Sequence, residues 1–388
     1  MRAPVLAVLF AALASCANPP AARADPQAIL FVGNSYTFGR VDPVMSYRAD
    51  VVHDLTAAFA IADPTGTNPW EPHPWGGVPG IFKQFTLEAG LDVDVSISAR
   101  NAATLRGHFL NTSSPAWDLR GNVASRRWDV VVLQDQSDVA LPAGKGKNAN
   151  LAQFEAYLGK WEGFIHDGAA ESYTETQLYG SLEACEAAGL SSTSCGIVRN
   201  IPQNANASAA TKIYLTQTWA RPDMVFAHLL TVADANTPDG APIVDTSSAG
   251  GPATLYEKSL AGLTRDLHES FATALRTHPR LAGLVHSGDA FQLALLEGAQ
   301  HEGFFDAAGV YVPDAPGGPI DLWWEDRLHA SKYGSYLDAL MHFGRITGRD
   351  PRSLGAGEQA ARDLAIAPAD AAFLQRVAAK TLALASSN

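Results

Sequence analysis

Three side chains of this sequence have the types and the spacing of a serine nucleophile with its base. Ser35 lies in the segment 29–37, and Asp326 and His329 lie three residues apart near the other end of the chain. A serine hydroxyl becomes a strong nucleophile when a base removes its proton, and that base needs a group that orients it. A short loop lets Asp326 hold one ring nitrogen of His329 while the other faces Ser35. The set indicates a hydrolase.

Each of these residues also has an ordinary structural explanation. Ser35 could be a turn or helix-cap serine, because such residues are common after strands. Asp326 could cap a helix that begins near Ala330, and His329 could be a surface histidine. The presence of all three together favours the catalytic interpretation.

The chain around these residues has the pattern of an α/β protein. The apolar run before Ser35 ends at a glycine, as in a buried strand that turns sharply, and open parallel sheets place their chemistry at such strand ends. Helical spacing is clearest from Leu255 to Leu275. The alternation predicts a three-layer α/β/α sandwich with a central parallel sheet. The expected strands are 28–32, 93–97, 129–133, 213–218 and 283–286.

Composition narrows the class of protein. The chain has 388 residues, 47% apolar and 18% charged, which is ordinary for a soluble globular enzyme. The net charge of −12, with no cluster of basic residues, argues against a nucleic-acid partner. We expect a leader at 1–24 and one domain at 25–388, with insertions near 63–80, 140–210 and 234–253. The Ala-rich segment 354–384 is expected to be helical and to pack on the sheet.

The N-terminal segment has the build of a bacterial secretory leader. Arg2 precedes an apolar stretch at 3–14 that is too short to remain as a membrane span. Two processing sites are open: an A-x-A site at 22–24, or a lipobox in which Cys16 is lipidated. The expected location is therefore extracytoplasmic, as a periplasmic, secreted or lipid-anchored protein. An oxidising compartment would favour a disulfide between Cys185 and Cys195 over two free thiols.

The chain resembles the SGNH, or GDSL-type, serine hydrolases. F-V-G-N-S-Y-T, which contains Ser35, resembles their nucleophile block, and D-R-L-H, which contains Asp326 and His329, resembles their closing block. The resemblance spans most of 27–346 and implies a flavodoxin-like parallel sheet. Asn34 stands where the family usually has Asp, so we expect it to brace the loop by hydrogen bonds without carrying charge.

The resemblance also implies an oxyanion hole with three donors. Ser35 N–H is the first. In the family a glycine N–H and an asparagine side chain complete the set; here Ala102 takes the place of the glycine, which a backbone donor tolerates if φ is negative. Gln136 is our preferred substitute for the asparagine, and Gln134 is the alternative.

Aromatic residues near Asp326 are candidates for a substrate pocket. Trp323 and Trp324 directly precede the acidic loop and could line an acyl or sugar pocket, or belong to the core. Weaker candidates of the same kind are Trp75, Trp219 and Tyr36. Asp289, after the last expected strand, is expected to cap the next helix.

The sequence predicts no metal and no cofactor. The histidines lack ligand spacings such as H-E-x-x-H, and nucleotide-binding glycine motifs do not occur. The histidines that we considered are His73, His108, His286, His301 and His342.

The leading hypothesis is an extracytoplasmic serine carboxylester hydrolase that works through an acyl-enzyme. The family resemblance favours short acyl groups, such as acetyl on cell-wall or plant polysaccharides. The expected partner is a small-molecule or glycan ester substrate. Two alternatives stay open: an acyltransferase that moves the acyl group to a glycan hydroxyl, and a non-catalytic glycan-binding lipoprotein. Contact with a membrane is expected only through a lipid on Cys16.

Overall fold

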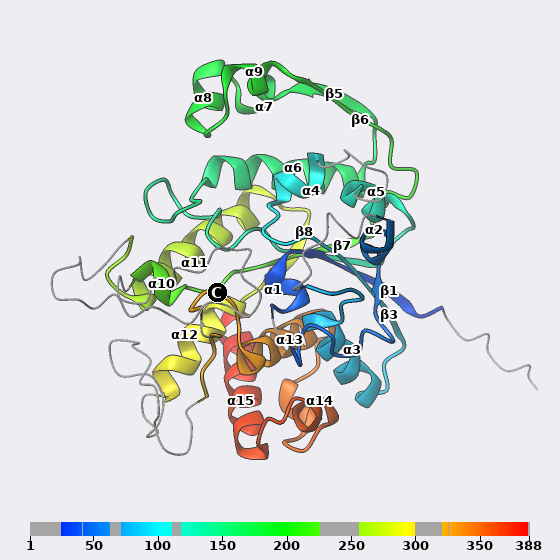
Figure 1. Ribbon diagram of the computed structural model, residues 1–388, viewed down its shortest axis with the longest axis vertical. Helices are drawn as coiled ribbons and strands as arrows, with labels where there is room; N and C mark the ends of the chain where they lie inside the picture. Colours follow the sequence, from blue (N-terminus) through cyan, green and yellow to red (C-terminus); the bar gives the residue numbers. More distant parts are fainter. Residues whose placement is uncertain are drawn as a thin grey trace, which may run out of the picture.

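A six-stranded parallel sheet forms the centre of the protein (Figure 1). The computed structural model describes residues 25–40, 42–62, 71–110, 118–225, 256–298, 320–324 and 326–386. The order across the sheet is β2-β3-β1-β4-β7-β8, so the five longer strands have the 2-1-3-4-5 order of flavodoxin-like folds. The strands are β1 Gln27–Gly33, β2 His53–Asp54, β3 Val93–Ala99, β4 Val130–Leu133, β7 Lys212–Thr216 and β8 Leu281–Val285.

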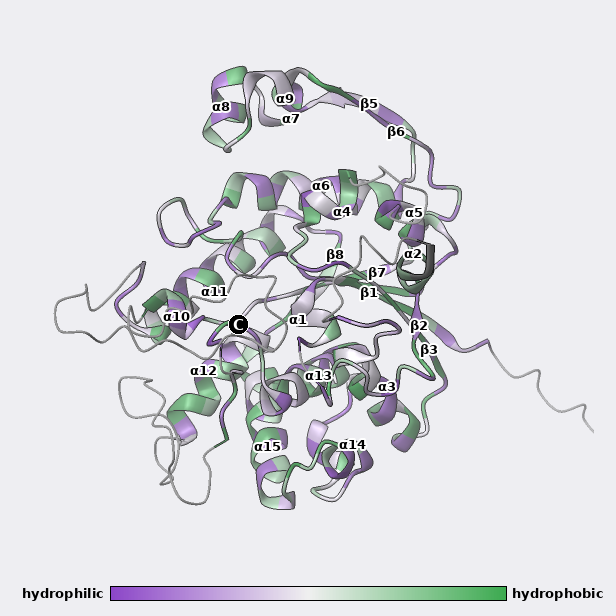
Figure 2. Cartoon of the chain, in the orientation of Figure 1, coloured by the Kyte–Doolittle hydropathy of each residue, from purple (hydrophilic) through white to green (hydrophobic). Residues whose placement is uncertain are grey.

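The central strand β1 is buried on both faces. It pairs with β3 on one side and β4 on the other, with Phe31 opposite Ile97 and Val132. A continuous apolar run suits such a position because helices cover both faces of a parallel sheet. Figure 2 shows mostly hydrophobic residues in these strands. The predicted three-layer α/β class and all five predicted strands are confirmed. The two-residue edge strand β2 was not predicted, because so short a segment has no period.

Helices form the layers on the two sides of the sheet. In Figure 1, α3, α13 and α15 lie on one side, and α4, α5 and α6 lie on the other. The predicted amphipathic helix is α11, which buries Leu263, Leu267 and Phe271 on one face. Leu255, assigned to the same pattern, is outside the described residues. The helices are α1 Ser35–Phe38, α2 Ala57–Ala62, α3 Gly77–Glu88, α4 Leu105–Leu110, α5 Leu119–Ala124, α6 Leu151–His166, α10 Pro222–Val225, α11 Leu260–Thr277, α12 Ser287–Gly298, α13 Lys332–Thr347, α14 Gln359–Asp363 and α15 Pro368–Ala385, with a 3₁₀ turn at Pro351–Leu354.

The segment 140–210 is more regular than expected. It contains the long helix α6, which belongs to one of the layers, followed by a small subregion that projects beyond α6 (Figure 1). Glu175 is fully buried at its base and binds Arg106, Arg199 and Tyr157. The subregion consists of β5 Glu171–Thr174, β6 Val198–Ile201, α7 Glu175–Tyr179, α8 Leu182–Ala187 and α9 Ser192–Gly196.

Two other expectations from the sequence concern the disulfide and the C-terminal segment. Cys185 of α8 and Cys195 of α9 are joined by a disulfide. The C-terminal segment is helical, as predicted, and α15 packs mainly against α13, α12 and the 3₁₀ turn, in the helical layer on one side of the sheet. The insertion at 234–253, residues 63–70 of another, and the leader with Cys16 lie outside the described residues. In the described part of the chain, no helix combines the length and apolarity needed to cross a membrane.

Candidate active site

The structure brings Ser35, His329 and Asp326 into one chain of hydrogen bonds. Ser35 Oγ lies 2.8 Å from His329 Nε2, and His329 Nδ1 lies 2.5 Å from Asp326 Oδ2. An ionised carboxylate can only accept, so the ring hydrogen belongs on Nδ1 and Nε2 is left to accept from the serine hydroxyl. This is the tautomer that a general base needs. The three residues are 6%, 8% and 7% exposed, respectively.

Ser35 lies in the tight turn that follows β1, and this turn requires glycine at position 33. A Cβ on Gly33 would lie 2.0 Å from Thr37 Oγ1, so only glycine fits there without a rearrangement. The Gly33 carbonyl accepts a hydrogen bond from His108 Nε2 at 2.7 Å. Burial lowers the pKa of His108 to about 4, so the imidazole is neutral and its single hydrogen is on Nε2. His108 therefore holds the turn at 33–37 that carries Ser35, here called the Ser35 turn, a role that its place in the sequence does not suggest.

Asn34 joins the Ser35 turn to two neighbouring loops. Its Oδ1 accepts from Tyr36 N–H at the start of α1, and its Nδ2 donates to the carbonyls of Ala103 and Asp135. These carbonyls follow β3 and β4, so one side chain connects three strand ends. An aspartate could not donate to either carbonyl. Asn34 thus braces the loop by hydrogen bonds, as expected where the family usually has Asp.

Backbone geometry holds Asp326 in place. Its Oδ1 accepts from the N–H groups of Leu328 and His329 at 3.0 and 2.9 Å, while Oδ2 takes the imidazole. Burial raises the pKa of Asp326, but the nearby His329 and these hydrogen bonds lower it more, to about 2. The carboxylate is therefore ionised at neutral pH. The next helix, α13, is capped by Ser331, so Asp326 is not a helix cap.

The loop between Asp326 and His329 contains a residue in a left-handed conformation. Arg327 has φ of 57°, which costs a non-glycine residue free energy. Its guanidinium is held by the carboxylate of Asp321, with Nη1 3.0 and 2.8 Å from the two oxygens. This ion pair stabilises the sharp turn that returns the imidazole toward Asp326.

Two aromatic side chains hold the loop from the other side. Tyr36 Oη and Trp219 Nε1 both donate to the carbonyl of Leu328, at 3.0 and 3.1 Å. The two rings are stacked with centroids 3.9 Å apart, and Tyr36 also meets the edge of His329. Tyr36 and Trp219, weak pocket candidates in the sequence, therefore hold the loop that carries His329.

The geometry of Ala102 differs from the expectation. Its φ is +55°, in the left-handed region, so the condition under which alanine replaces glycine without cost, a negative φ, is not met. This is a conformation that glycine adopts at little cost and alanine does not. The loop itself is close to the nucleophile, because Asn34 binds the carbonyl of Ala103. Ala102 N–H as an oxyanion donor remains a prediction.

The two glutamines after β4 have different surroundings. Gln134 Oε1 accepts from Asn34 N–H and Thr37 Oγ1, and its Nε2 donates to the Asp135 carbonyl, so its amide is occupied in bracing the turn. Gln136 is partly exposed, and its Oε1 accepts from Asp138 N–H. Among the described residues nothing accepts from Gln136 Nε2. This contrast favours Gln136 over Gln134 as the side-chain donor.

Asp135 is a buried carboxyl group directly behind these donors. It is 1% exposed, and its Oδ1 accepts from the N–H groups of Leu105 and Gln136. Burial raises its pKa to about 7, although both hydrogen bonds oppose the shift. Sequence reasoning did not single it out, because burial of an acid has no local signature.

The tryptophans near the acidic loop divide between core and surface. Trp323 is 2% exposed, donates from Nε1 to the Ala220 carbonyl and packs on Phe291, so a pocket role for it is wrong. Trp324 is partly exposed and donates from its backbone N–H to the His329 carbonyl, so its pocket role stays a prediction. Trp75 is buried against Phe38.

Asp289 and the remaining histidines have roles other than those expected. Asp289 is inside the first turn of α12, and its carboxylate binds His268, His286 and Gln217, so it does not cap the helix. His73 pairs with Asp54, and His342 binds Thr216. His301 lies outside the described residues.

Comparison with known proteins gives distant likenesses only. No family model matches the chain, and no curated protein matches it. A DUF4886 family protein from Bacteroides uniformis is 10% identical, covering 92% of this chain and 95% of that chain with a TM-score of 0.45. A proposed SGNH hydrolase from Slackia heliotrinireducens is 17% identical, covering 83% and 100% with a TM-score of 0.36. An inhibitor-bound aryl esterase of M. smegmatis is 11% identical, covering 83% and 99% with a TM-score of 0.33. These likenesses carry no argument about function.

Proposed function

We propose that the protein is a serine carboxylester hydrolase of the SGNH kind. The observation that carries the proposal is the chain of hydrogen bonds from Ser35 through His329 to Asp326. A nucleophile, a base and an orienting carboxylate at hydrogen-bond distance form the minimal set for acyl transfer. Their convergence from opposite ends of the sequence onto one sheet edge is difficult to explain by loop structure alone.

The proposed reaction has two halves. Ser35 Oγ attacks the ester carbonyl carbon while its proton moves to His329 Nε2, and the carbonyl oxygen becomes an oxyanion. As the tetrahedral intermediate collapses, the alcohol leaves with the proton from Nε2, and an acyl-enzyme remains. Water then attacks, gives its proton to Nε2, and releases the acid as Ser35 regains its hydrogen. Asp326 keeps the imidazole in the required tautomer throughout.

We assign oxyanion stabilisation to the N–H groups of Ser35 and Ala102 and to the side chain of Gln136. The hydrogen bonds of the first turn of α1 begin with Tyr36 N–H, and in the described part of the chain Ser35 N–H has no acceptor. Removing one such donor typically costs about 3 to 4 kcal/mol of transition-state stabilisation. Gln136 is the donor that mutation can remove without touching the backbone.

The substrate that we propose is an ester of a short acyl group on a glycan or a small alcohol, outside the cytoplasm. The leader-like N-terminus and the disulfide between Cys185 and Cys195 support an extracytoplasmic location. Transfer of the acyl group to a glycan hydroxyl is the alternative, and the product formed with and without a glycan acceptor distinguishes the two reactions.

The test is hydrolysis of p-nitrophenyl acetate by the wild type and by Ser35→Ala. Loss of the nucleophile is expected to lower kcat by about 10⁶, which is the size seen when a serine of a triad is removed. A fluorophosphonate probe should label the wild type and not this variant. Ser353→Ala, at an exposed serine of the 3₁₀ turn, is the matched control and should keep full activity. Undiminished turnover by a folded Ser35→Ala protein would refute the proposal.

A further inference from the structure

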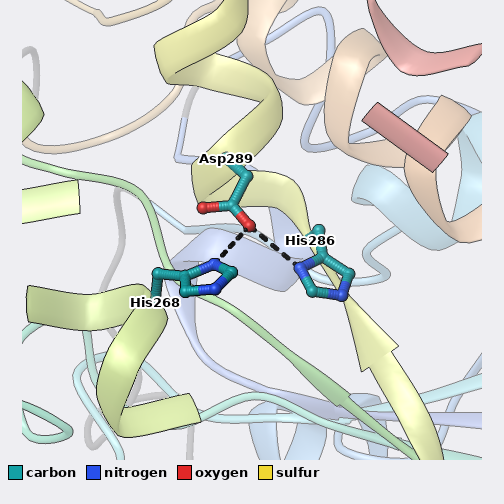
Figure 3. Close-up of side chains that lie close together, drawn as sticks. All are labelled: His268, His286 and Asp289. Atoms are coloured by element: carbon teal, nitrogen blue, oxygen red, sulfur yellow. Dashed lines mark hydrogen bonds and ion pairs between the residues drawn. The ribbon is translucent and has the colours of Figure 1, made fainter. Parts of the chain in front are cut away.

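Three potential metal ligands that do not belong to the hydrogen-bond chain of Ser35 meet at the end of β8. His268 comes from α11, His286 follows β8, and Asp289 lies in the first turn of α12 (Figure 3). Asp289 Oδ2 lies 2.8 Å from His268 Nδ1 and 2.9 Å from His286 Nδ1. One ligand atom from each residue lies within 4.8 Å of the others. These three groups therefore converge on a small volume from three different elements.

We propose that His268, His286 and Asp289 bind a divalent transition-metal ion, with Zn²⁺ as the best fit. Two imidazole nitrogens and one carboxylate oxygen suit zinc, and three protein ligands leave a position open for water or an added ligand. Bond lengths of about 2.0 to 2.1 Å in a tetrahedron place ligand atoms about 3.3 Å apart. The two observed separations, 2.8 and 2.9 Å, need to lengthen by only a few tenths of an ångström.

The protonation states can adapt to a cation. Both imidazoles now donate from Nδ1 to the carboxylate, and a neutral ring can move that hydrogen to Nε2 so that Nδ1 is free for the metal. The side chain of His268 is 42% exposed, so it has room to make the small shift.

A buried amide fixes the carboxylate in the orientation that a ligand needs. Gln217 Nε2 donates to Asp289 Oδ1 at 2.9 Å, and Gln217 Oε1 accepts from Asp289 N–H. Carboxylates that bind metals are commonly oriented by a hydrogen bond of this type, which leaves the other oxygen for the ion. Gln217 is completely buried at the end of β7. A simple surface pair of histidine and aspartate would not require such support.

Nearby positive charges do not prevent binding. Arg276, two helical turns beyond His268 on α11, donates from Nη2 to Thr273 Oγ1 at 2.8 Å, so its guanidinium does not occupy the carboxylate of Asp289. The positive end of α12 disfavours a cation, but the carboxylate of Asp289 in its first turn offsets that charge. The three residues also line an open groove of about 600 Å³, so an ion there is accessible from solvent.

Zinc titration by calorimetry, with the wild type and His268→Ala, tests the proposal. We expect one Zn²⁺ per chain with a micromolar or lower dissociation constant. Loss of His268 should weaken binding at least about tenfold, the effect seen when only a residue that orients a ligand is removed. With Co²⁺, the wild type should show the visible absorption of a four- or five-coordinate ion, and the variant should lose it.

His53→Ala is the matched control. His53 is an exposed histidine paired with Asp94 at 3.0 Å, and within the described ranges it belongs to no group of three possible metal ligands. Its removal should leave zinc affinity unchanged. The proposal is overturned if the wild type binds no zinc, or if His268→Ala binds it as well as the wild type does. It is also overturned if the His53→Ala variant, and not the His268→Ala variant, loses the site. None of these outcomes depends on esterase activity.

Discussion

Replacing Asp326 by Asn is the most informative perturbation of the proposed active site. Asp326 Oδ1 is fixed by two backbone N–H groups, so in the variant the amide oxygen keeps that position and the NH₂ group faces His329 Nδ1. Two donors cannot share a hydrogen bond, so Nδ1 must lose its hydrogen and Nε2 must carry it. Nε2 then donates to Ser35 Oγ and can no longer accept its proton. The side chain keeps its shape, while the base is lost.

The expected size of the effect follows from this change of tautomer. When the acid of a serine triad becomes an amide, kcat falls by about 10⁴, equivalent to about 5 kcal/mol of activation free energy. The variant should also lose stability at neutral pH, because the folded carboxyl group has a pKa of about 2 in place of 3.8. A carboxyl group with a lowered pKa contributes stability above pH 3.8, and this contribution disappears as the pH falls through 2. For Asp326 the contribution to the free energy of unfolding is about 2 kcal/mol.

Two measurements separate catalysis from folding. Steady-state hydrolysis of p-nitrophenyl acetate gives kcat, and thermal unfolding at pH 7 shows whether the variant is folded at the assay temperature. His329→Ala should lower kcat by about 10⁶, more than the factor of about 10⁴ expected for Asp326→Asn, and the double variant should be no worse than His329→Ala alone, since the residues act as a unit. A folded Asp326→Asn protein with more than about a tenth of the wild-type kcat would refute the assignment of Asp326, because a wrong tautomer costs far more.

Two further substitutions test the backbone and the electrostatics beside the nucleophile. Ala102→Gly should raise the free energy of unfolding by about 0.5 to 1 kcal/mol, because φ of +55° costs alanine more than the added freedom of glycine costs in the unfolded chain. Denaturant titration checks this, and Ala103→Gly, at a neighbour without positive φ, should instead destabilise. Asp135→Asn should leave the melting temperature nearly unchanged at pH 3 and raise it at pH 9. The pKa of Asp135 is 3.8 in the unfolded chain and about 7 in the folded protein. The free energy of unfolding of the wild type therefore falls as the pH rises between these values, by at most about 4 kcal/mol. An equal shift at both pH values would contradict the raised pKa.

Much of the fold could be predicted from the sequence because its signals are local. Strands β1 and β4 are continuous apolar runs, and a parallel sheet between two helical layers needs such runs. Ser35 and His329 could be placed together because each lies in a recognisable segment, and the order of the strands brings those segments to one edge.

The parts that could not be predicted depend on contacts between distant segments. The hydrogen bond from Trp219 to Leu328 joins residues 109 apart, and that from Tyr36 to Leu328 joins residues 292 apart, so neither leaves a local pattern. The choice between Gln134 and Gln136 depends on which amide the Ser35 turn occupies, and only three-dimensional packing decides that. The meeting of His268 with His286 likewise requires α11 and β8 to be side by side.

The two hydrogen bonds that the Leu328 carbonyl accepts, from Tyr36 and Trp219, restrict the motion of the loop. Tyr36 follows Ser35 in the chain, and Leu328 precedes His329, so one hydrogen bond joins the segments of the proposed nucleophile and the proposed base one residue from each. The base loop cannot swing outward without breaking this bond and the one from Trp219, and it would also unstack two rings 3.9 Å apart. The stacked rings of Tyr36 and Trp219 should therefore limit the thermal fluctuation of the distance between Ser35 Oγ and His329 Nε2. The flexibility of the loop that carries His329 should matter much less.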